Sequence, residues 1–267
     1  WIGMNCATGP GFMRDHLRTL AGISRFPVAV IPNAGLPDEN GEYHETPNMI
    51  ADTIRQYLDE GWVDIIGGCC GTTPDHIRKL RDVSSGRVPP QRNPVPVSAI
   101  SGLESLVVND DNRPIIVGER TNVLGSRRFK RLISEDKIDE ASEIGRHQIR
   151  NGAHILDVCL QDPDRDEIVD MAKFLQALTR KVKAPLMIDS TDEKVIEEAL
   201  KFTPGKSLIN SINLEDGEKR FGEVVPLSRR YGAALIVGCI DEDVRQAQAI
   251  TRERKLQIAE RSSKILM

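Results

Sequence analysis

The sequence predicts an α/β protein in which parallel β-strands alternate with amphipathic helices. Short, continuous apolar runs alternate with longer segments of helical period along most of the chain, which is the pattern of a parallel sheet that is buried on both faces. Residue types that can bind ligands or metals follow most of these runs: Cys6, Asn33, Cys69, Asn122, Asp157, Asp189 and Asn210. In a (β/α)8 barrel the carboxyl ends of all strands converge on one site, whereas in a doubly wound open sheet they spread along an edge. We therefore predict TIM-type barrels.

Three βα units are expected before a proline-rich stretch. The expected strands are Trp1–Asn5, Phe26–Ile31 and Val63–Ile66. The expected helices are Phe12–Ala21, Thr46–Glu60 and Asp75–Val83. Thr46 and Pro47 are typical of an N-cap and a first helical residue, because proline lacks the N–H that this position leaves unpaired.

Residues 87–112 interrupt this alternation. Prolines stand at positions 89, 90, 94 and 96, and there is little helical or strand period before Leu106. This composition favours irregular structure, so we predict that residues 87–112 link two domains, residues 1–86 and residues 113–267.

Five further βα units are expected after the linker. The expected strands are Ile115–Val117, Ile155–Cys159, Leu186–Ile188, Leu208–Ile212 and Ala233–Val237. The expected helices are Ser134–Asn151, Asp166–Val182, Glu193–Leu200, Gly217–Tyr231 and a last helix from near Asp243 to the end. A complete barrel needs eight units and about 250 residues. We therefore expect the last three units of one barrel and the first five of a second, in a fragment that is inactive alone.

The composition is that of a soluble globular protein, with 39% hydrophobic and 28% charged residues and a net charge of -4. This charge balance does not favour nucleic acid or a membrane surface as a partner, and no apolar run approaches the ~20 residues of a membrane span. Five cysteines in a chain of this length argue against a disulfide scaffold. We therefore expect a cytoplasmic protein.

The most informative stretch is residues 67–74 (GGCCGTTP), where adjacent cysteines follow an expected strand. The glycines allow the backbone to leave the strand so that both thiols face one point; the alternatives are two small buried side chains or a strained disulfide. Cys6 follows another strand, so three thiols are expected at one barrel mouth. Three thiolates leave a tetrahedral Zn²⁺ one open position, where a substrate thiol would be deprotonated. A structural zinc would need a fourth protein ligand, for which His76 is near in sequence but expected to be exposed.

Three motifs together resemble the end of a known barrel: residues 3–10 (GMNCATGP), 32–37 (PNAGLP) and 67–74. They are similar to the zinc-dependent homocysteine-binding barrel of cobalamin-dependent methionine synthases and betaine–homocysteine methyltransferases. The resemblance implies that Cys6, Cys69 and Cys70 are zinc ligands and that homocysteine is the thiol substrate.

The second domain places a short carboxylate or amide side chain at the end of several strands. These residues are Asn122, Asp157, Asp189 and Asn210. Carboxylates accept hydrogen bonds and amides both donate and accept them, which suits the edge of a pterin ring with its ring nitrogens, amino group and carbonyl. Taken singly, Asp157 and Asp189 also fit the alternative role of helix N-caps.

Residues 114–122 (PIIVGERTN) are expected to be a strand with a polar tip, and the motif VGERTN at 117–122, with Gly125 and Ser126 after it, resembles the pterin-binding barrel. Cobalamin-dependent methionine synthases, corrinoid methyltransferases and dihydropteroate synthases share this barrel. The resemblance implies that Asn122, Asp157, Asp189 and Asn210 hold 5-methyltetrahydrofolate. Cys159 stands where many relatives carry Asn; we expect it in the core and Cys239 in the core or a loop.

A homocysteine barrel followed by a folate barrel is the order found in the cobalamin-dependent methionine synthase family. The resemblance implies methyl transfer from 5-methyltetrahydrofolate to homocysteine via cobalamin, which gives methionine and tetrahydrofolate. Zn²⁺ and cobalamin are the implied cofactors, and a cobalamin domain outside this chain is the implied partner. No catalytic residue is assigned. The alternatives are a folate-dependent corrinoid methyltransferase with another acceptor, or a non-catalytic zinc- or pterin-binding remnant.

Overall fold

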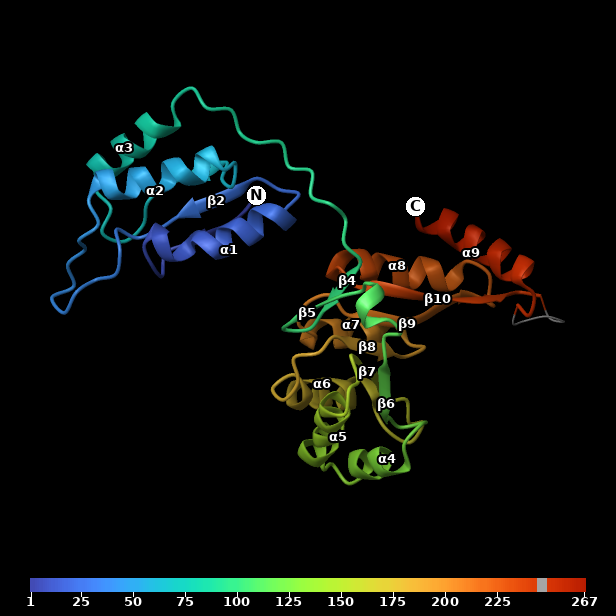
Figure 1. Ribbon diagram of the computed structural model, residues 1–267. Helices are drawn as coiled ribbons and strands as arrows, with labels where there is room; N and C mark the ends of the chain where they lie inside the picture. The colour runs from blue at the N-terminus through green and yellow to red at the C-terminus, as the bar shows by residue number, and fades with distance from the viewer. Residues whose placement is uncertain (244–248) are drawn as a thin grey trace. The chain divides into compact units, whose positions relative to one another are not determined.

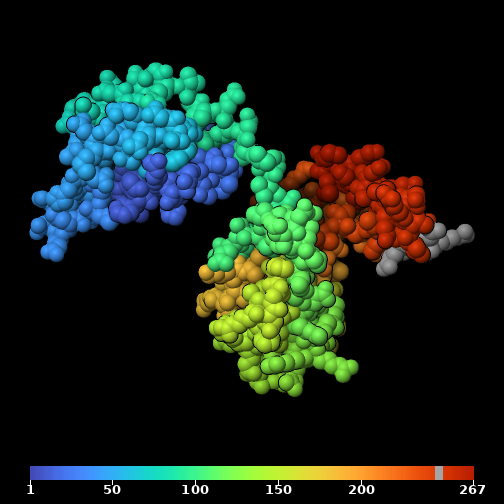
Figure 2. All heavy atoms as spheres, in the orientation of Figure 1, coloured from blue at the N-terminus to red at the C-terminus, as the bar shows by residue number. Residues whose placement is uncertain are grey.

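The computed structural model describes residues 1–243 and 249–267, which form two compact α/β units, Trp1–Pro96 and Val97–Met267 (Figures 1 and 2). Each unit contains a parallel sheet with helices between successive strands. Within the described residues, no helix is both long and apolar enough to cross a membrane.

The first unit is a three-stranded parallel sheet in the order β1-β2-β3. Its strands are β1 (Ile2–Asn5), β2 (Val28–Ile31) and β3 (Ile65–Ile66). Its helices are α1 (Pro10–Ile23), α2 (Pro47–Asp59) and α3 (Pro74–Ser84). The three βα units predicted from sequence are confirmed, with ends that differ by a few residues.

The central strand β2 organises the core of the first unit. Val28 and Val30 are fully buried, and Leu17 of α1 and Ile54 of α2 pack in the same cluster. Helix α2 begins as predicted, because the Thr46 side chain accepts a hydrogen bond from the Met49 backbone.

The Pro-rich segment is attached to the first unit by a buried ion pair. Arg92 Nε lies 2.6 Å from Asp64 Oδ2, and both side chains are only 7% exposed. The same carboxylate oxygen accepts a hydrogen bond of 2.6 Å from the Val28 backbone. Folding removes both charged side chains from water. If either were lost, the other would remain as a buried charge without compensation.

The second unit is a five-stranded parallel sheet in the order β10-β9-β8-β7-β6. Its strands are β6 (Val117–Asn122), β7 (Ile155–Cys159), β8 (Leu186–Asp189), β9 (Leu208–Leu214) and β10 (Ala234–Asp241). Its helices are α4 (Arg127–Ser134), α5 (Ile138–Arg150), α6 (Glu167–Leu178), α7 (Glu193–Phe202), α8 (Lys219–Tyr231) and α9 (Arg252–Leu266). All residues of β7 are buried, as expected for a central strand covered on both faces.

Two helices begin or divide differently from the prediction. The segment predicted as one helix, Ser134–Asn151, contains the end of α4, a turn at Asp136 with a positive φ of 53°, and α5. Helix α4 was missed, although Ser126 caps it by accepting a hydrogen bond from the Phe129 backbone. The last helix begins at Arg252; the predicted start near Asp243 leads into residues 244–248, which lie outside the described residues.

Part of the stretch predicted as a linker has regular structure. Strands β4 (Ala99–Ser101) and β5 (Ser105–Val107) form an antiparallel hairpin, followed by the 3-10 helix η1 (Asp110–Asn112). The Ser101 backbone donates to the Lys206 carbonyl (3.0 Å), and Ile100 packs against residues at the amino ends of β7, β8 and β9. The hairpin therefore covers the end of the sheet opposite to the predicted site.

Candidate functional site

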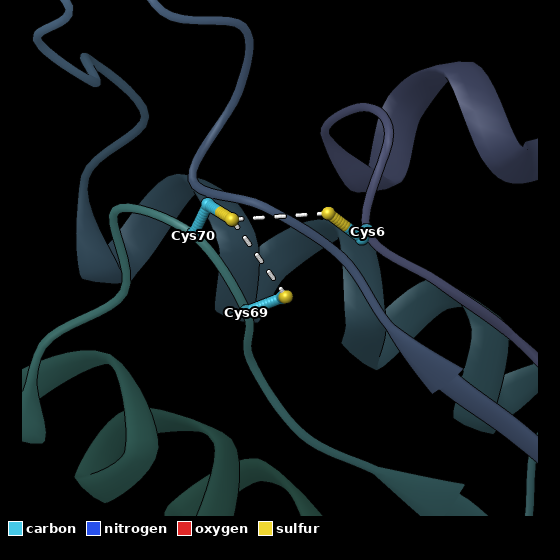
Figure 3. A group of neighbouring side chains, drawn as sticks. All are labelled: Cys6, Cys69 and Cys70. Atoms are coloured by element: carbon cyan, nitrogen blue, oxygen red, sulfur yellow. Dashed lines mark hydrogen bonds between the residues drawn. The ribbon is translucent and has the colours of Figure 1, made fainter.

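The three predicted metal ligands lie together at the carboxyl ends of β1 and β3. We call Cys6, Cys69 and Cys70 the thiol cluster. Their sulfur atoms point toward one another and all lie within 4.8 Å of each other (Figure 3). The Cys70 sulfur lies 3.7 Å from that of Cys6 and 3.9 Å from that of Cys69.

These separations match the geometry of a tetrahedral zinc–thiolate site. With Zn–S bonds of about 2.3 Å, two ligands of a tetrahedron are about 3.8 Å apart. All three thiols are free, so the alternative of a strained disulfide between the adjacent cysteines does not hold in this structure. Because Cys69 is half-buried and Cys70 is exposed, the alternative that the adjacent cysteines are two small buried side chains does not hold either.

The loop after β2 holds the thiol cluster in place. The Cys69 N–H donates to the Pro32 carbonyl (2.8 Å), and the Cys70 N–H donates to the Asn33 side-chain oxygen (3.2 Å). Cys6 itself has a positive φ of 63°, and its N–H donates to the Ile31 carbonyl (2.8 Å). The backbone thus leaves the strand direction at Cys6, and a neighbouring loop fixes the two adjacent cysteines.

Tyr43 packs beside the thiol cluster and was not found from the sequence. A Cβ at Gly71 would overlap the Tyr43 side chain, and Gly71 has a φ of +75°, so only glycine fits there. Burial and the neighbouring Cys70 thiol raise the pKa of Tyr43. Tyr43 lies in a loop without periodic pattern, so nothing in the local sequence distinguishes it.

His76 is buried, which contradicts the expectation that it is exposed. Its Nδ1 accepts a hydrogen bond from the Thr73 N–H (3.1 Å), so its Nε2 carries the proton and donates to the Glu45 carbonyl (2.9 Å). His76 therefore caps the start of α3. Both ring nitrogens are used, which removes it as the fourth ligand of a structural zinc.

The cysteines influence each other's ionisation. Hydrogen bonds from the Ala7 backbone and from the other two thiols lower the pKa of Cys6. Hydrogen bonds with Cys6 and Cys69, and the charges of these two thiols, raise the pKa of Cys70. A divalent metal ion bound by the three sulfur atoms would offset the repulsion between neighbouring thiolates, so the cluster suits such an ion.

The four polar residues predicted for the second domain lie on four neighbouring strands: Asn122 and Asp189 end β6 and β8, whereas Asp157 and Asn210 lie within β7 and β9. We call Asn122, Asp157, Asp189 and Asn210 the polar cluster. Asn122 Nδ2 donates to Asp157 Oδ2 (3.0 Å) and to Asp189 Oδ2 (3.3 Å). Asp189 pairs with Asn210 in the register of β8 and β9. A hollow of about 410 Å³ beside Asp189 and Asn210 is lined by residues of β8 and β9, of the loops that follow them and of the first turns of α7 and α8.

Asp157 has the most unusual environment in the polar cluster. Its side chain is only 3% exposed, and its Oδ1 has no hydrogen-bond partner among the described residues. Burial raises the pKa of Asp157 to about 6, with smaller contributions from the charges of Asp189 and Glu119. Burial also raises the pKa of Asp189. A buried acceptor without a partner is a position that a donor of a ligand can fill.

Asp157 and Asp189 do not act as helix caps. The helix after β7 is capped by Asp166, whose side chain accepts from the Val169 backbone. The helix after β8 is capped by Asp192, which accepts from the Lys194 backbone. The alternative role considered from the sequence is therefore wrong for both residues.

The remaining cysteines have structural environments. Cys159 is buried, and burial raises its pKa to about 12, which keeps the thiol protonated. Cys239 is half-buried, and its sulfur lies 3.8 Å from the Lys255 carbonyl. The predicted places of both residues are confirmed.

Comparison with known proteins gives two family matches in the order of the two units. The homocysteine S-methyltransferase model matches residues 1–84, and the pterin binding enzyme model matches residues 118–266. The chain is 37% identical over 267 residues to the methionine synthase of Mycobacterium tuberculosis (strain ATCC 25618 / H37Rv). It is 37% identical over 272 residues to that of Mycobacterium leprae (strain TN). Each alignment covers 97% of this chain and 22% of the relative's length.

Proposed function

The chain belongs to the pterin binding enzyme family, and we propose that it is the part of a methionine synthase that joins a homocysteine site to a methyltetrahydrofolate site. The proposed reaction transfers a methyl group from 5-methyltetrahydrofolate to homocysteine through cobalamin. One observation carries the proposal: a single chain contains a homocysteine S-methyltransferase unit with a thiol cluster, followed by a pterin binding unit with a polar cluster.

Cys6, Cys69 and Cys70 would hold the zinc ion. When bound, Zn²⁺ supplies a Lewis acid that lowers the pKa of a coordinated thiol. The three sulfur atoms lie close enough together to serve as three ligands of one ion, and the exposure of Cys70 leaves one side open to solvent. The chain itself thus orients the site and leaves room for the sulfur of homocysteine.

The polar cluster would hold the pterin ring. The free Oδ1 of Asp157 and the carboxylate of Asp189 accept hydrogen bonds from ring N–H and amino groups, whereas the amides of Asn122 and Asn210 can both donate and accept. The demethylated pterin leaves as a neutral amine only if its N5 is protonated. Fixed polar groups that favour the form protonated at N5 contribute most to catalysis when they need no rearrangement during the reaction.

The two sheets fit incomplete barrels. We assign β1–β3 to the last three units of one (β/α)8 barrel and β6–β10 to the first five of another. The alignments with much longer relatives support this assignment, because they leave sequence for the remaining units and for a cobalamin domain. We expect the protein to work in the cytoplasm, in agreement with its few cysteines, which are all free.

Transfer of an isotope-labelled methyl group tests the proposal. The complete protein that carries this chain is incubated with cobalamin, homocysteine and 5-methyltetrahydrofolate labelled in its methyl group. We expect the label in methionine. A protein that demethylates the folate without forming methionine would be a corrinoid methyltransferase with another acceptor. A protein that binds zinc or the folate but transfers no methyl group would be a non-catalytic remnant.

A further inference from the structure

Strand β6 contains a bulge directly before the polar cluster. Gly118 pairs with Leu156 and Thr121 pairs with Val158, so three steps along β6 match two steps along β7. In a regular strand, residues three apart face opposite sides of the sheet. Here both residues face α5, which only the extra residue of a bulge allows.

Contacts with α5 show the direction of both residues. A Cβ at Gly118 would lie 2.8 Å from Gln148 Oε1, and a Cβ at Gly145 would lie 3.5 Å from Thr121 Cγ2. Gln148 and Gly145 both belong to α5. Gly118 therefore allows the Gln148 side chain to approach the strand where any other residue would crowd it.

Gln148 supplies the hydrogen bond that the bulge needs. Its Oε1 accepts from the Arg120 backbone N–H at 2.7 Å. Strand β6 lies at the edge of the sheet, so within residues 1–243 and 249–267 no second strand pairs with it. A helix side chain thus takes the place of a ladder partner at the irregular position.

The bulge places Glu119 on the same side of the sheet as Asn122, although residues three apart on a regular strand face opposite sides. Since Gly118 faces α5, its neighbour Glu119 faces the other side of the sheet, where Asn122 contacts Asp157. The charge of Glu119 contributes to the raised pKa values of both Asp157 and Asp189, in agreement with this direction.

We propose that Gln148 is a positioning residue: by accepting a hydrogen bond from the Arg120 backbone, it holds the β6 bulge that puts Glu119 on the same side of the sheet as Asn122, where a pterin would bind at the polar cluster. This inference rests on the proposed function for the identity of the ligand. The bulge and its hydrogen bond do not depend on that identity.

Three variants of the complete protein test the proposal. Gln148→Met keeps the side-chain length but removes the acceptor, and Gln148→Glu keeps an acceptor oxygen. Gln176→Met changes an exposed glutamine of α6 and is the matched control. Hydrogen exchange of the peptide at residues 117–122 reports on the bulge without ligand, and titration with 5-methyltetrahydrofolate reports on the site.

We expect Gln148→Met to accelerate exchange in this peptide and to weaken folate binding by roughly tenfold, the effect of one lost hydrogen bond at the upper end of its usual range. Gln148→Glu should keep most of the wild-type protection from exchange and most of the wild-type folate affinity. In a Glu119→Gln background, Gln148→Met should weaken folate binding by less than about twofold. The effects of the two substitutions should not add, because Gln148 acts on the ligand through Glu119.

Three results would overturn the inference. The first is a Gln148→Met protein whose hydrogen exchange and folate affinity equal those of the wild type. The second is an equal loss of folate affinity from Gln148→Met with Glu119 and with Gln at position 119. The third is a Gln148→Glu protein in which neither the exchange rate nor the affinity returns toward the wild-type value. A wild-type protein that does not bind the folate would instead refute the proposed function. The exchange data would then still decide whether Gln148 holds the bulge.

Discussion

Replacing Asp157 with Asn tests the assignment of the pterin site through both stability and binding. The Asp157 side chain is buried in β7, and its pKa is raised from 3.8 to about 6, mainly by burial. Asn122 donates a hydrogen bond to it, which opposes the increase. The amide introduced by Asp157→Asn can still accept this bond but carries no charge.

The sign of the stability effect follows from proton binding. Because the folded-state pKa lies above the unfolded value, the native protein binds this proton more tightly than the unfolded chain does. The resulting stabilisation is complete below pH 3.8 and is lost as pH rises through about 6. A shift of about 2 units corresponds to ~3 kcal/mol, of which about 2 kcal/mol falls between pH 4.5 and 7.5. Asp157→Asn should therefore stabilise the second unit by up to about 2 kcal/mol more at pH 7.5 than at pH 4.5.

Folate binding should change in the opposite direction. The ionised carboxylate can accept from two ligand donors, whereas the amide offers one acceptor oxygen. Loss of a hydrogen bond to a charged group costs about 1.5–3 kcal/mol, which is roughly a 10- to 150-fold weaker affinity at pH 7.5. Zinc content should not change, because the thiol cluster belongs to the other unit.

Urea unfolding of the complete protein measures the stability, with hydrogen exchange of the peptide at residues 155–159 reporting on the second unit. Titration with 5-methyltetrahydrofolate measures the affinity. Asp164→Asn, at an exposed position in the following loop, is the control and should change neither. An Asp157→Asn protein that is less stable than the wild type at pH 7.5, or that binds folate like the wild type, would refute the reasoning.

Two further variants test the first unit. Cys69→Ala in the complete protein should abolish zinc retention and homocysteine turnover, measured by metal analysis and methionine formation, while methyl transfer from the folate to free cobalamin continues; Cys239→Ala should retain zinc. Retained zinc with normal turnover would contradict the ligand assignment. Arg92→Met should destabilise the first unit by about 3–5 kcal/mol, because it leaves the buried carboxylate of Asp64 without a compensating positive charge. Arg87→Met, which breaks a more exposed ion pair, should cost less than about 1 kcal/mol in the same unfolding assay, and equal effects would refute the argument.

Strand positions and the residues that follow them could be predicted because both depend on local patterns. The buried strand β7 was predicted with its observed bounds, Ile155–Cys159. Neighbouring strands of a parallel sheet bring residues at their ends and along one face close together, so the sequence could predict the members of the thiol and polar clusters.

Features that depend on tertiary contacts were missed. Helix α4 has only eight residues and is rich in Arg and Lys, and its apolar side chains Phe129, Leu132 and Ile133 are too few to establish a period. The β4–β5 hairpin has strands of three residues each, and its stability depends on contacts with the sheet. Tyr43 and Glu119 reach the candidate sites through packing and through a strand bulge, neither of which shows in sequence pattern.

X-ray absorption at the zinc edge of the complete protein tests the central claim most directly, because it counts the sulfur atoms around the metal. We predict three sulfur ligands at about 2.3 Å without substrate and four after homocysteine is added. Three sulfur ligands in both samples would contradict the claim that the open position of the Cys6, Cys69 and Cys70 site receives the substrate thiol.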